Sequence, residues 1–271
     1  TISVALEALT LSYLLSLLDL SPMVFTHNTL TTGATASNLL GLCVGRDWTV
    51  ARVKQAQRHE GWSVPEDGMG GVEVDVLVVD AHASVRKAAA LAGLGRRSVV
   101  QVGDAEAEKE GRLVCMDLRR LEERLTDNVA KGRGSIVVTS FGEVNTGCAS
   151  SSRLPWGSST DGPVFRSAIN SDTPTIRALC DKYHAWLHID AAFAAFAVLH
   201  PDFAPYQPHL ALADSITSDA HKWLNVPYDC GIFLSRARTV VGPNASDSTI
   251  TASLYDPVSY THLTLPTIYS V

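Results

Sequence analysis

Short apolar runs alternate with helical periodicities along most of this chain. Runs of β-branched and other apolar residues predict strands at 74–79, 98–102, 134–139, 185–189, 214–218 and 230–234. Helical spacing predicts helices at 85–91, 116–127 and 176–183, with Ser84 as the N-cap of the first and Thr173 as the N-cap of the last. This order of strands and helices favours the α/β class, with a mostly parallel sheet flanked by helices.

The first apolar stretch, residues 2–20, raises the question of a membrane segment. It contains Glu7 and Asp19, lacks a basic flank, and places its leucines at helical spacing. These features favour an amphipathic helix packed on the domain over a signal peptide or a membrane-spanning helix.

Composition limits the partners and the compartment. The chain has 271 residues, a formal net charge of −6 and 46% hydrophobic residues, which is ordinary for a soluble globular enzyme. The acidic balance gives no electrostatic reason to expect nucleic acid or an anionic membrane as a partner. The five cysteines are scattered without a CxxC pair, which favours reduced thiols in a cytoplasmic protein.

Two residues that follow predicted strands suggest the chemistry. Asp190 ends one apolar run, where a buried carboxylate needs a cationic partner. That partner is either an arginine elsewhere in the chain or the protonated nitrogen of a cofactor ring. Lys222 follows another strand and lies between His221 and Trp223, an unusual setting for a surface lysine. Pyridoxal phosphate requires such a pair, because its aldehyde needs an amine and its ring nitrogen needs an anion.

A third segment is suited to a phosphate group. Small and hydroxylated residues at 26–38 run directly into an apolar helical pattern. A helix start of this kind offers free backbone N–H groups, Gly33 permits close approach, and Thr35 adds a hydroxyl. An ordinary helix with a Ser or Thr cap is the alternative interpretation. The segment is neither a Walker loop nor a dinucleotide-binding glycine motif.

Three histidines allow functional and structural interpretations. His82 follows the strand at 74–79, at the edge where ligands bind in open α/β sheets. Its ring could stack on a flat cofactor, or it could be a capping or surface histidine. His184 and His188 are four residues apart, but the strand predicted at 185–189 separates them too far for a metal pair. A structural role is favoured for both, and no metal is expected.

Four motifs in order carry a family resemblance. They are Thr-Thr-Gly-Ala-Thr-Ala-Ser-Asn at 31–38, Asp-Ala-His-Ala-Ser at 80–84, His-Ile-Asp-Ala-Ala-Phe at 188–193 and Asp-Ala-His-Lys-Trp at 219–223. With them the chain resembles the group II pyridoxal phosphate-dependent decarboxylases, the family of aromatic-L-amino-acid, tyrosine, histidine and glutamate decarboxylases. The resemblance implies the large domain of the aspartate aminotransferase type (fold type I), with a seven-stranded sheet.

The resemblance also implies roles for individual residues. Lys222 would form the imine with pyridoxal 5'-phosphate, Asp190 would pair with the pyridine nitrogen, and His82 would stack on the ring. Further cofactor contacts are implied for Ala34, Thr35, Ala192 and His221. The implied reaction is the loss of the α-carboxylate of an L-amino acid as CO₂, in a cytoplasmic enzyme that is a homodimer when full length.

Some positions depart from the family pattern and keep alternatives open. Ala36 replaces an acid of the phosphate turn, Glu143 stands where Thr is common in animal aromatic decarboxylases, and Asp219 stands where many members carry Asn near the phosphate. A carboxylate at 219 would repel the phosphate unless it is turned away. One alternative is a carbon–carbon lyase of the sphingosine phosphate lyase type. Another is a catalytically incomplete fragment that binds the cofactor without turnover.

The resemblance leaves both ends of the family pattern uncovered. We expect residues 1–257 to be an incomplete cofactor-binding large domain, because the chain starts without Met in the middle of a pattern. Residues 149–172 are polar and rich in turn formers, as in a surface excursion or a mis-assembled stretch. Residues 258–271 are similar to translated adaptor sequence, which predicts a non-native tail.

Overall fold

The computed structural model describes residues 2–79, 81–103, 116–142, 172–240 and 250–251. The expectations for Glu143, for the tail at 258–271 and for all of the insert except its last residue, Asp172, lie outside the described residues.

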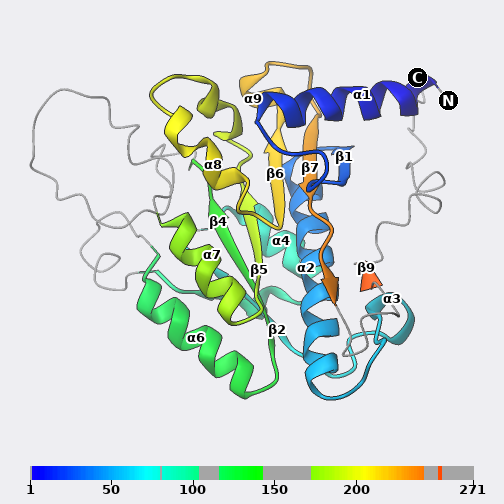
Figure 1. The fold of residues 1–271 in the computed structure, drawn as a ribbon, viewed down its shortest axis with the longest axis vertical. Coiled ribbons are helices and arrows are strands. Elements are labelled where there is room, and N and C mark those ends of the chain that lie inside the picture. Colours follow the sequence, from blue (N-terminus) through cyan, green and yellow to red (C-terminus); the bar gives the residue numbers. More distant parts are fainter. Residues whose placement is uncertain (1, 80, 104–115, 143–171, 241–249, 252–271) are drawn as a thin grey trace, which may run out of the picture.

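A seven-stranded sheet forms the centre of the fold, in the order β1-β7-β6-β5-β4-β2-β3 (Figure 1). Strand β7 is antiparallel to both of its neighbours, β1 and β6, and the other pairs are parallel. The strands are β1 (His27–Thr31), β2 (Val74–Val78), β3 (Val99–Gln101), β4 (Gly134–Ser140), β5 (Trp186–Asp190), β6 (Ser215–Asp219) and β7 (Gly231–Ser235). Strands β8 (Thr239–Val240) and β9 (Ile250–Thr251) pair separately. The predicted α/β class with a mostly parallel sheet is confirmed.

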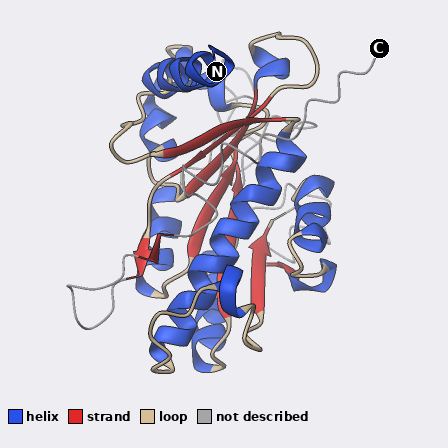
Figure 2. Cartoon of the chain, turned by 90° about the vertical axis from the view of Figure 1, so that its right-hand side faces the viewer, coloured by secondary structure: helices blue, strands red, loops and turns tan. Residues whose placement is uncertain are grey.

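Helices cover both faces of this sheet (Figures 1 and 2). The described helices are α1 (Ile2–Leu17), α2 (Ala34–Ala56), α3 (Val64–Asp67), α4 (Ala83–Leu91), α6 (Leu118–Ala130), α7 (Thr173–Lys182), α8 (Gln207–Leu210) and α9 (Ala220–Trp223). Short 3₁₀ turns lie at Arg96–Ser98, Ala195–Leu199 and Ala204–Tyr206.

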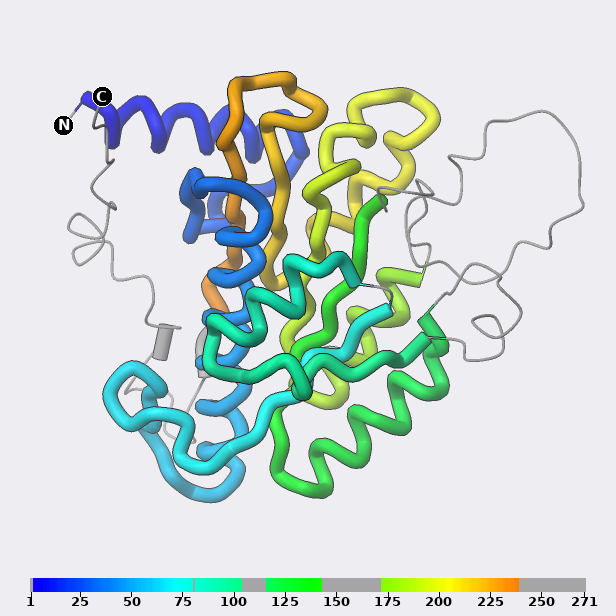
Figure 3. Tube along the Cα trace, turned by 180° about the vertical axis from the view of Figure 1, so that it is seen from behind, coloured from blue at the N-terminus to red at the C-terminus, as the bar shows by residue number. Residues whose placement is uncertain are grey.

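Alternation along the strands sends side chains to both faces of the sheet, where they join three apolar clusters of the described residues. Val76 and Ile136 pack with α2 and α4 on one face, where α4 crosses in front of the sheet in the rear view (Figure 3). Leu77, Val137 and Leu187 pack with α6 and α7 on the other face. Because each strand is buried on both faces, the sequence shows continuous apolar runs rather than an alternating pattern.

Two glycines allow α2 to lie directly on β5. A Cβ at Gly41 would lie 2.4 Å from the His188 ring, and one at Gly45 would lie 2.8 Å from the Trp186 ring. Only hydrogen fits at these positions, so any larger residue would push the helix off the sheet. The close approach places the first turns of α2 beside the carboxyl end of β5.

The N-terminal helix forms as predicted but differs from the prediction in how its apolar side chains are arranged. Residues 2–17 are helical as expected, but the apolar side chains surround the helix, so Leu11 and Leu15 are buried while Leu6 and Tyr13 stay exposed. No helix among the described residues combines the length and the hydrophobicity that a membrane span requires.

The caps of α4 and α7 each lie one or two residues before the predicted position. His82 caps α4, and its ring nitrogen accepts the N–H of Ser84, the residue that was predicted to be the cap. Asp172 precedes α7, so Thr173 is its first residue rather than its cap. Cap identity depends on backbone angles that residue type alone does not determine.

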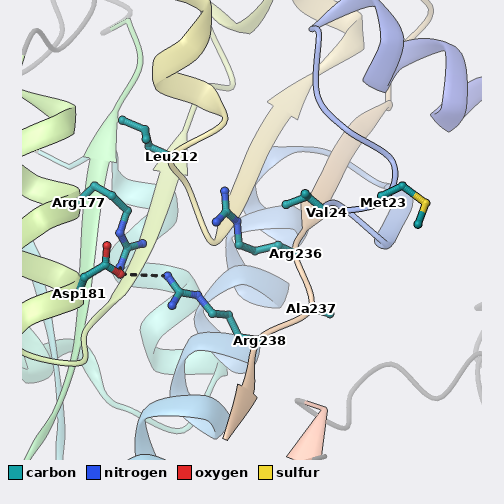
Figure 4. Close-up of a pocket in the computed structure, with 8 residues that line it drawn as sticks. All are labelled: Met23, Val24, Arg177, Asp181, Leu212, Arg236, Ala237 and Arg238. Atoms are coloured by element: carbon teal, nitrogen blue, oxygen red, sulfur yellow. Dashed lines mark hydrogen bonds and ion pairs between the residues drawn. The ribbon is translucent and has the colours of Figure 1, made fainter. Parts of the chain in front are cut away.

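A group of charged residues surrounds a pocket of about 590 Å³ at the amino ends of β5 and β6 (Figure 4). Arg177, Asp181, Arg236 and Arg238 contribute to its lining. Beside it Asp214 is fully buried and accepts from Arg177 Nη1 at 2.8 Å, Arg238 Nε at 2.6 Å and the Leu187 N–H at 2.8 Å. These bonds connect three elements to one carboxylate: helix α7, strand β5 and the segment that follows β7.

Replacing Asp214 with Ala should destabilise the chain strongly. The substitution leaves the buried Arg177 guanidinium without its carboxylate, and breaking a buried pair in this way costs roughly 3–5 kcal/mol. Urea denaturation of the wild-type and variant chains measures the difference. Arg119→Ala serves as the control, because the Arg119–Glu123 pair is exposed and 3.8 Å long. Equal loss in both variants would contradict the prediction.

Candidate active site

Asp190 is the buried acid of the site. It is the last residue of β5 and only 8% exposed. Asn38 Nδ2 donates to its Oδ2 at 2.9 Å, and the backbone N–H of Ala192 donates to its Oδ1 at 3.2 Å. Both donors are neutral amides, so among the described residues this carboxylate receives neutral hydrogen bonds rather than the arginine that the sequence left open.

Burial raises the pKa of Asp190 above the ordinary carboxyl value. The bonds from Asn38 and Ala192 and the charges of Lys222 and His82 act in the opposite direction. Lys222 and His82 therefore lie close enough to Asp190 to act on it electrostatically. The structure brings the three residues predicted as catalytic to one edge of the sheet, at the carboxyl ends of β2, β5 and β6.

Lys222 lies on the one-turn helix α9, which begins directly after β6. Its Nζ is 3.1 Å from Asp219 Oδ2, and its side chain is about one-third exposed (32%). Trp223 next to it meets Phe193 edge-on, with ring centroids 6.4 Å apart. Phe193 lies in the loop that follows Asp190 and β5. Its contact with Trp223 therefore holds the lysine segment against this loop.

His221 links the lysine segment to the start of α2. Its Nδ1 is 3.0 Å from the carbonyl oxygen of Cys230 and accepts the N–H of the same residue at 3.2 Å. The Tyr228 ring lies on it with a centroid distance of 3.9 Å. A Cβ at Gly33 would be 3.9 Å from His221 Cε1, so the turn before α2 adjoins this imidazole.

The start of α2 offers donors for an anion. Gly33 is the N-cap, with φ of 125°, and no side chain caps the helix. The backbone N–H groups in the first turn of a helix have no acceptor within the helix. Those of Ala34 and Thr35 therefore belong to the positive end of the helix dipole and have no acceptor inside α2. The alternative interpretation, a helix with a Ser or Thr cap, is wrong.

Asp219 departs from the family pattern but is turned to a cation. It is 3% exposed, its Oδ2 pairs with Lys222, and the same oxygen is 3.7 Å from His221 Nε2. Its Oδ1 and the Ser218 hydroxyl are buried without a hydrogen-bond partner. A polar ligand at this edge would satisfy such atoms, since unpaired buried polar atoms are costly.

Two residues of the site were not predicted to belong to it: Asn38 had no assigned role, and Ser84 was predicted only as a helix cap. Asn38 and Ser84 are buried and bonded to each other, with Asn38 Nδ2 donating to Ser84 Oγ at 3.1 Å. Ser84 Oγ is also 2.8 Å from His82 Nδ1. Asn38 is part of the motif at 31–38, but nothing local in the sequence signals its contact with a residue 152 positions away.

The residue types of this edge fit pyridoxal phosphate. An amine, a buried carboxylate and an uncapped helix start match the aldehyde, the ring nitrogen and the phosphate of that cofactor. Among the described residues there is no group of three His, Cys, Asp or Glu side chains that could hold a metal ion. His188 is instead fully buried and bonded to Asn38 and Ser215.

Comparison with known proteins supports this interpretation of the site. Residues 170–247 match the pyridoxal-dependent decarboxylase conserved domain. The chain is 32% identical over 209 residues to the L-2,4-diaminobutyrate decarboxylase of Acinetobacter baumannii, covering 75% of this chain and 36% of that protein. It is 29% identical over 212 residues to the histidine decarboxylase of Drosophila melanogaster, covering 78% and 21%. The chain thus spans about a third or less of these relatives.

Solved structures share the fold. The glutamate decarboxylase domain of a diaminobutyrate-pyruvate transaminase and L-2,4-diaminobutyrate decarboxylase from Vibrio parahaemolyticus superposes with a TM-score of 0.65 at 25% identity, over 86% of this chain and 43% of that one. The structure of Oryza sativa TDC with PLP superposes with a TM-score of 0.62 at 22% identity, over 85% and 43%.

The fold is that of the fold type I, pyridoxal phosphate-dependent decarboxylases among its structural neighbours. In sequence the chain is similar to the pyridoxal-dependent amino-acid decarboxylases, so the resemblance carried by its motifs is confirmed.

The stability of the cofactor-free chain should depend on the ionisation of Asp190. Its pKa is raised in the folded state, so the folded chain binds this proton more tightly than the unfolded chain. The tighter binding of this proton stabilises the folded chain at acidic pH. This stabilisation is lost as the pH rises from the ordinary carboxyl pKa, about 4, through the raised pKa of the folded state. The free energy of unfolding of wild type should therefore fall relative to Asp190→Asn between acidic and neutral pH.

Urea denaturation of both chains at a series of pH values measures this difference. Asp202→Asn is the control, because Asp202 is exposed. Parallel pH profiles for wild type and Asp190→Asn would show that the burial of Asp190 has no such consequence.

Proposed function

We propose that the protein containing this chain removes the α-carboxylate of an L-amino acid, with pyridoxal 5'-phosphate as cofactor. One observation carries the proposal. Strand β5 ends at Asp190, and the neighbouring parallel strand β6 leads directly into α9, the helix that bears Lys222. The charge of Lys222 acts on the buried Asp190 carboxyl. An amine and a buried acid at one sheet edge are the pair that this cofactor needs.

Each residue of the edge has a proposed task. Lys222 supplies the amine that attaches the cofactor, and Asp190 holds a proton on the ring nitrogen. His82 lies against the ring, and Ala192, whose N–H orients the Asp190 carboxyl, contacts the other face. The first turn of α2 at Ala34 and Thr35 receives the phosphate, with His221 beside it.

The cofactor supplies an electrophilic aldehyde and an electron-accepting ring. The contribution of the protein would be orientation, because its residues would hold the substrate in one fixed position beside the cofactor. The Asp219 carboxylate beside Lys222 Nζ is placed to accept a proton from this amine or return one to it, since the two atoms are 3.1 Å apart.

The assembly and surroundings follow from the same resemblance. We propose a cytoplasmic protein, homodimeric when full length, whose substrate is an amino acid as a small molecule and which has neither nucleic acid nor membrane as a partner. The acidic net charge of −6 and the scattered cysteines support this proposal.

Lys222→Ala should abolish both turnover and covalent attachment of the cofactor. In the full-length protein, CO₂ release from carboxyl-labelled amino acids should fall by several orders of magnitude, because the attacking amine is gone. Borohydride reduction followed by peptide mass spectrometry should locate the cofactor on Lys222 in the wild type and on no lysine in the variant. Lys182→Ala is the matched control, because Lys182 is an exposed residue at the end of α7 that pairs with Glu122 of α6.

The products distinguish the alternatives. Release of an aldehyde from a phosphorylated amino alcohol, without CO₂, would assign the carbon–carbon lyase reaction. Attachment of the cofactor at Lys222 without turnover of any amino acid would assign a binding function. Failure of wild type to retain the cofactor would overturn the proposal.

A further inference from the structure

A continuous series of side-chain hydrogen bonds runs through the core to Asp190. Trp186 Nε1 is 2.9 Å from Ser215 Oγ, which is 2.7 Å from His188 Nδ1. His188 Nε2 is 2.9 Å from Asn38 Oδ1, and Asn38 Nδ2 is 2.9 Å from Asp190 Oδ2. All five residues are buried. We refer to Trp186, Ser215, His188 and Asn38 as the donor chain.

The direction of these bonds is set from the carboxylate end, and the indole end is compatible with it. An indole nitrogen only donates, so Ser215 Oγ accepts from Trp186 and can give its single hydrogen to His188 Nδ1. At the other end an ionised carboxylate only accepts, so the NH₂ group of Asn38 faces Asp190. The carbonyl oxygen of Asn38 then faces His188, which must donate from Nε2. The two lines of reasoning meet at a neutral imidazole that carries its hydrogen on Nε2.

The surroundings of His188 agree with a neutral ring. It is fully buried, and burial lowers the pKa of His188 to about 3. Gly41 of α2 packs directly on the imidazole, which fixes its plane. Thr217 Oγ1 lies 3.3 Å from Nε2 as a second, weaker partner.

A branch of the same network reaches His82. The second hydrogen of Asn38 Nδ2 goes to Ser84 Oγ at 3.1 Å, and Ser84 Oγ is 2.8 Å from His82 Nδ1. One amide group therefore contacts Asp190 directly and His82 through a single hydroxyl. These are the residues proposed to hold the cofactor ring at its nitrogen and on its face.

We propose that the donor chain is the device that orients Asp190 and holds it as a carboxylate, with Asn38 and His188 as positioning residues for the cofactor ring nitrogen. The role toward the cofactor rests on the proposed function. The role toward Asp190 is a property of the chain itself. Because the donors point one way, each bond polarises the next, and the last of them ends on the anion.

The first test uses the unmodified, cofactor-free chain. With ¹⁵N-labelled histidine, His188 should show a protonated Nε2 and a bare Nδ1, and it should not titrate between about pH 5 and 8, the range in which ordinary histidines do. A hydrogen on Nδ1, or titration in that range, would overturn the proposal.

The second test uses a matched pair of variants. His188→Gln places an amide donor near the former Nε2 position, whereas His188→Asn is too short to reach Asn38. The carboxyl ¹³C signal of Asp190 reports its titration in each cofactor-free chain. We expect His188→Asn to raise the apparent pKa of Asp190 above that in wild type, and His188→Gln to keep it close to wild type. If His188→Gln raised the pKa of Asp190 as much as His188→Asn does, a donor at position 188 would not control Asp190 and the proposal would be overturned.

Cofactor titration then tests the link to the proposed function. The dissociation constant of pyridoxal phosphate should increase on the order of tenfold in His188→Asn and Asn38→Leu, the loss expected for one charge-assisted hydrogen bond. His188→Gln should retain most of the affinity. Unchanged affinity in His188→Asn would overturn the positioning role. A wild-type protein that binds no cofactor would refute the proposed function, while the NMR results would still decide whether the donor chain controls Asp190.

Discussion

The structure depends on how it holds one carboxyl group that is almost fully removed from water. Asp190 ends the central strand β5 with 8% of its surface exposed, and burial alone favours its protonated form. Two amide donors and the nearby positive charges oppose that effect. A carboxyl group in this balance is receptive to a further cation, because a positive group placed beside it relieves the cost of burial. The architecture around β5 can be understood as support for this one group.

Helix α2 provides most of that support, through residues that lie on successive turns. Its uncapped start at Gly33 faces His221, Asn38 one turn later contacts Asp190, and Gly41 and Gly45 seat the helix on β5. A single helix thus combines an anion-binding end, a positioning amide and the close packing that keeps both in register. Small residues at 41 and 45 are required, because a helix held further from the sheet would separate Asn38 from Asp190.

Hydrophobic patterning predicted six strands of the seven-stranded sheet, because strands buried on both faces leave continuous apolar runs, and each predicted strand lies within one or two residues of the observed one. The polar residues at strand ends predicted the site edge for the same reason, since parallel strands bring their carboxyl ends together. Patterning missed β1, whose residues His27–Thr31 are mostly polar and only partly buried. The caps at His82 and Asp172 were missed because they depend on local backbone geometry. The contact of Asn38 with Asp190 was missed because it depends on how α2 crosses the sheet, which no local pattern encodes.

Two buried carboxylates at opposite edges of the sheet illustrate how partner choice separates stability from function. Asp214, at the amino edge, is bonded to the guanidinium groups of Arg177 and Arg238. Asp190, at the carboxyl edge, receives neutral hydrogen bonds from Asn38 and Ala192. An arginine in direct contact with Asp190 would neutralise its charge and compete with a pyridinium for the same oxygens. Neutral donors orient the carboxylate without cancelling its charge, so Asp190 would still be able to pair with a cationic ring under the proposed function.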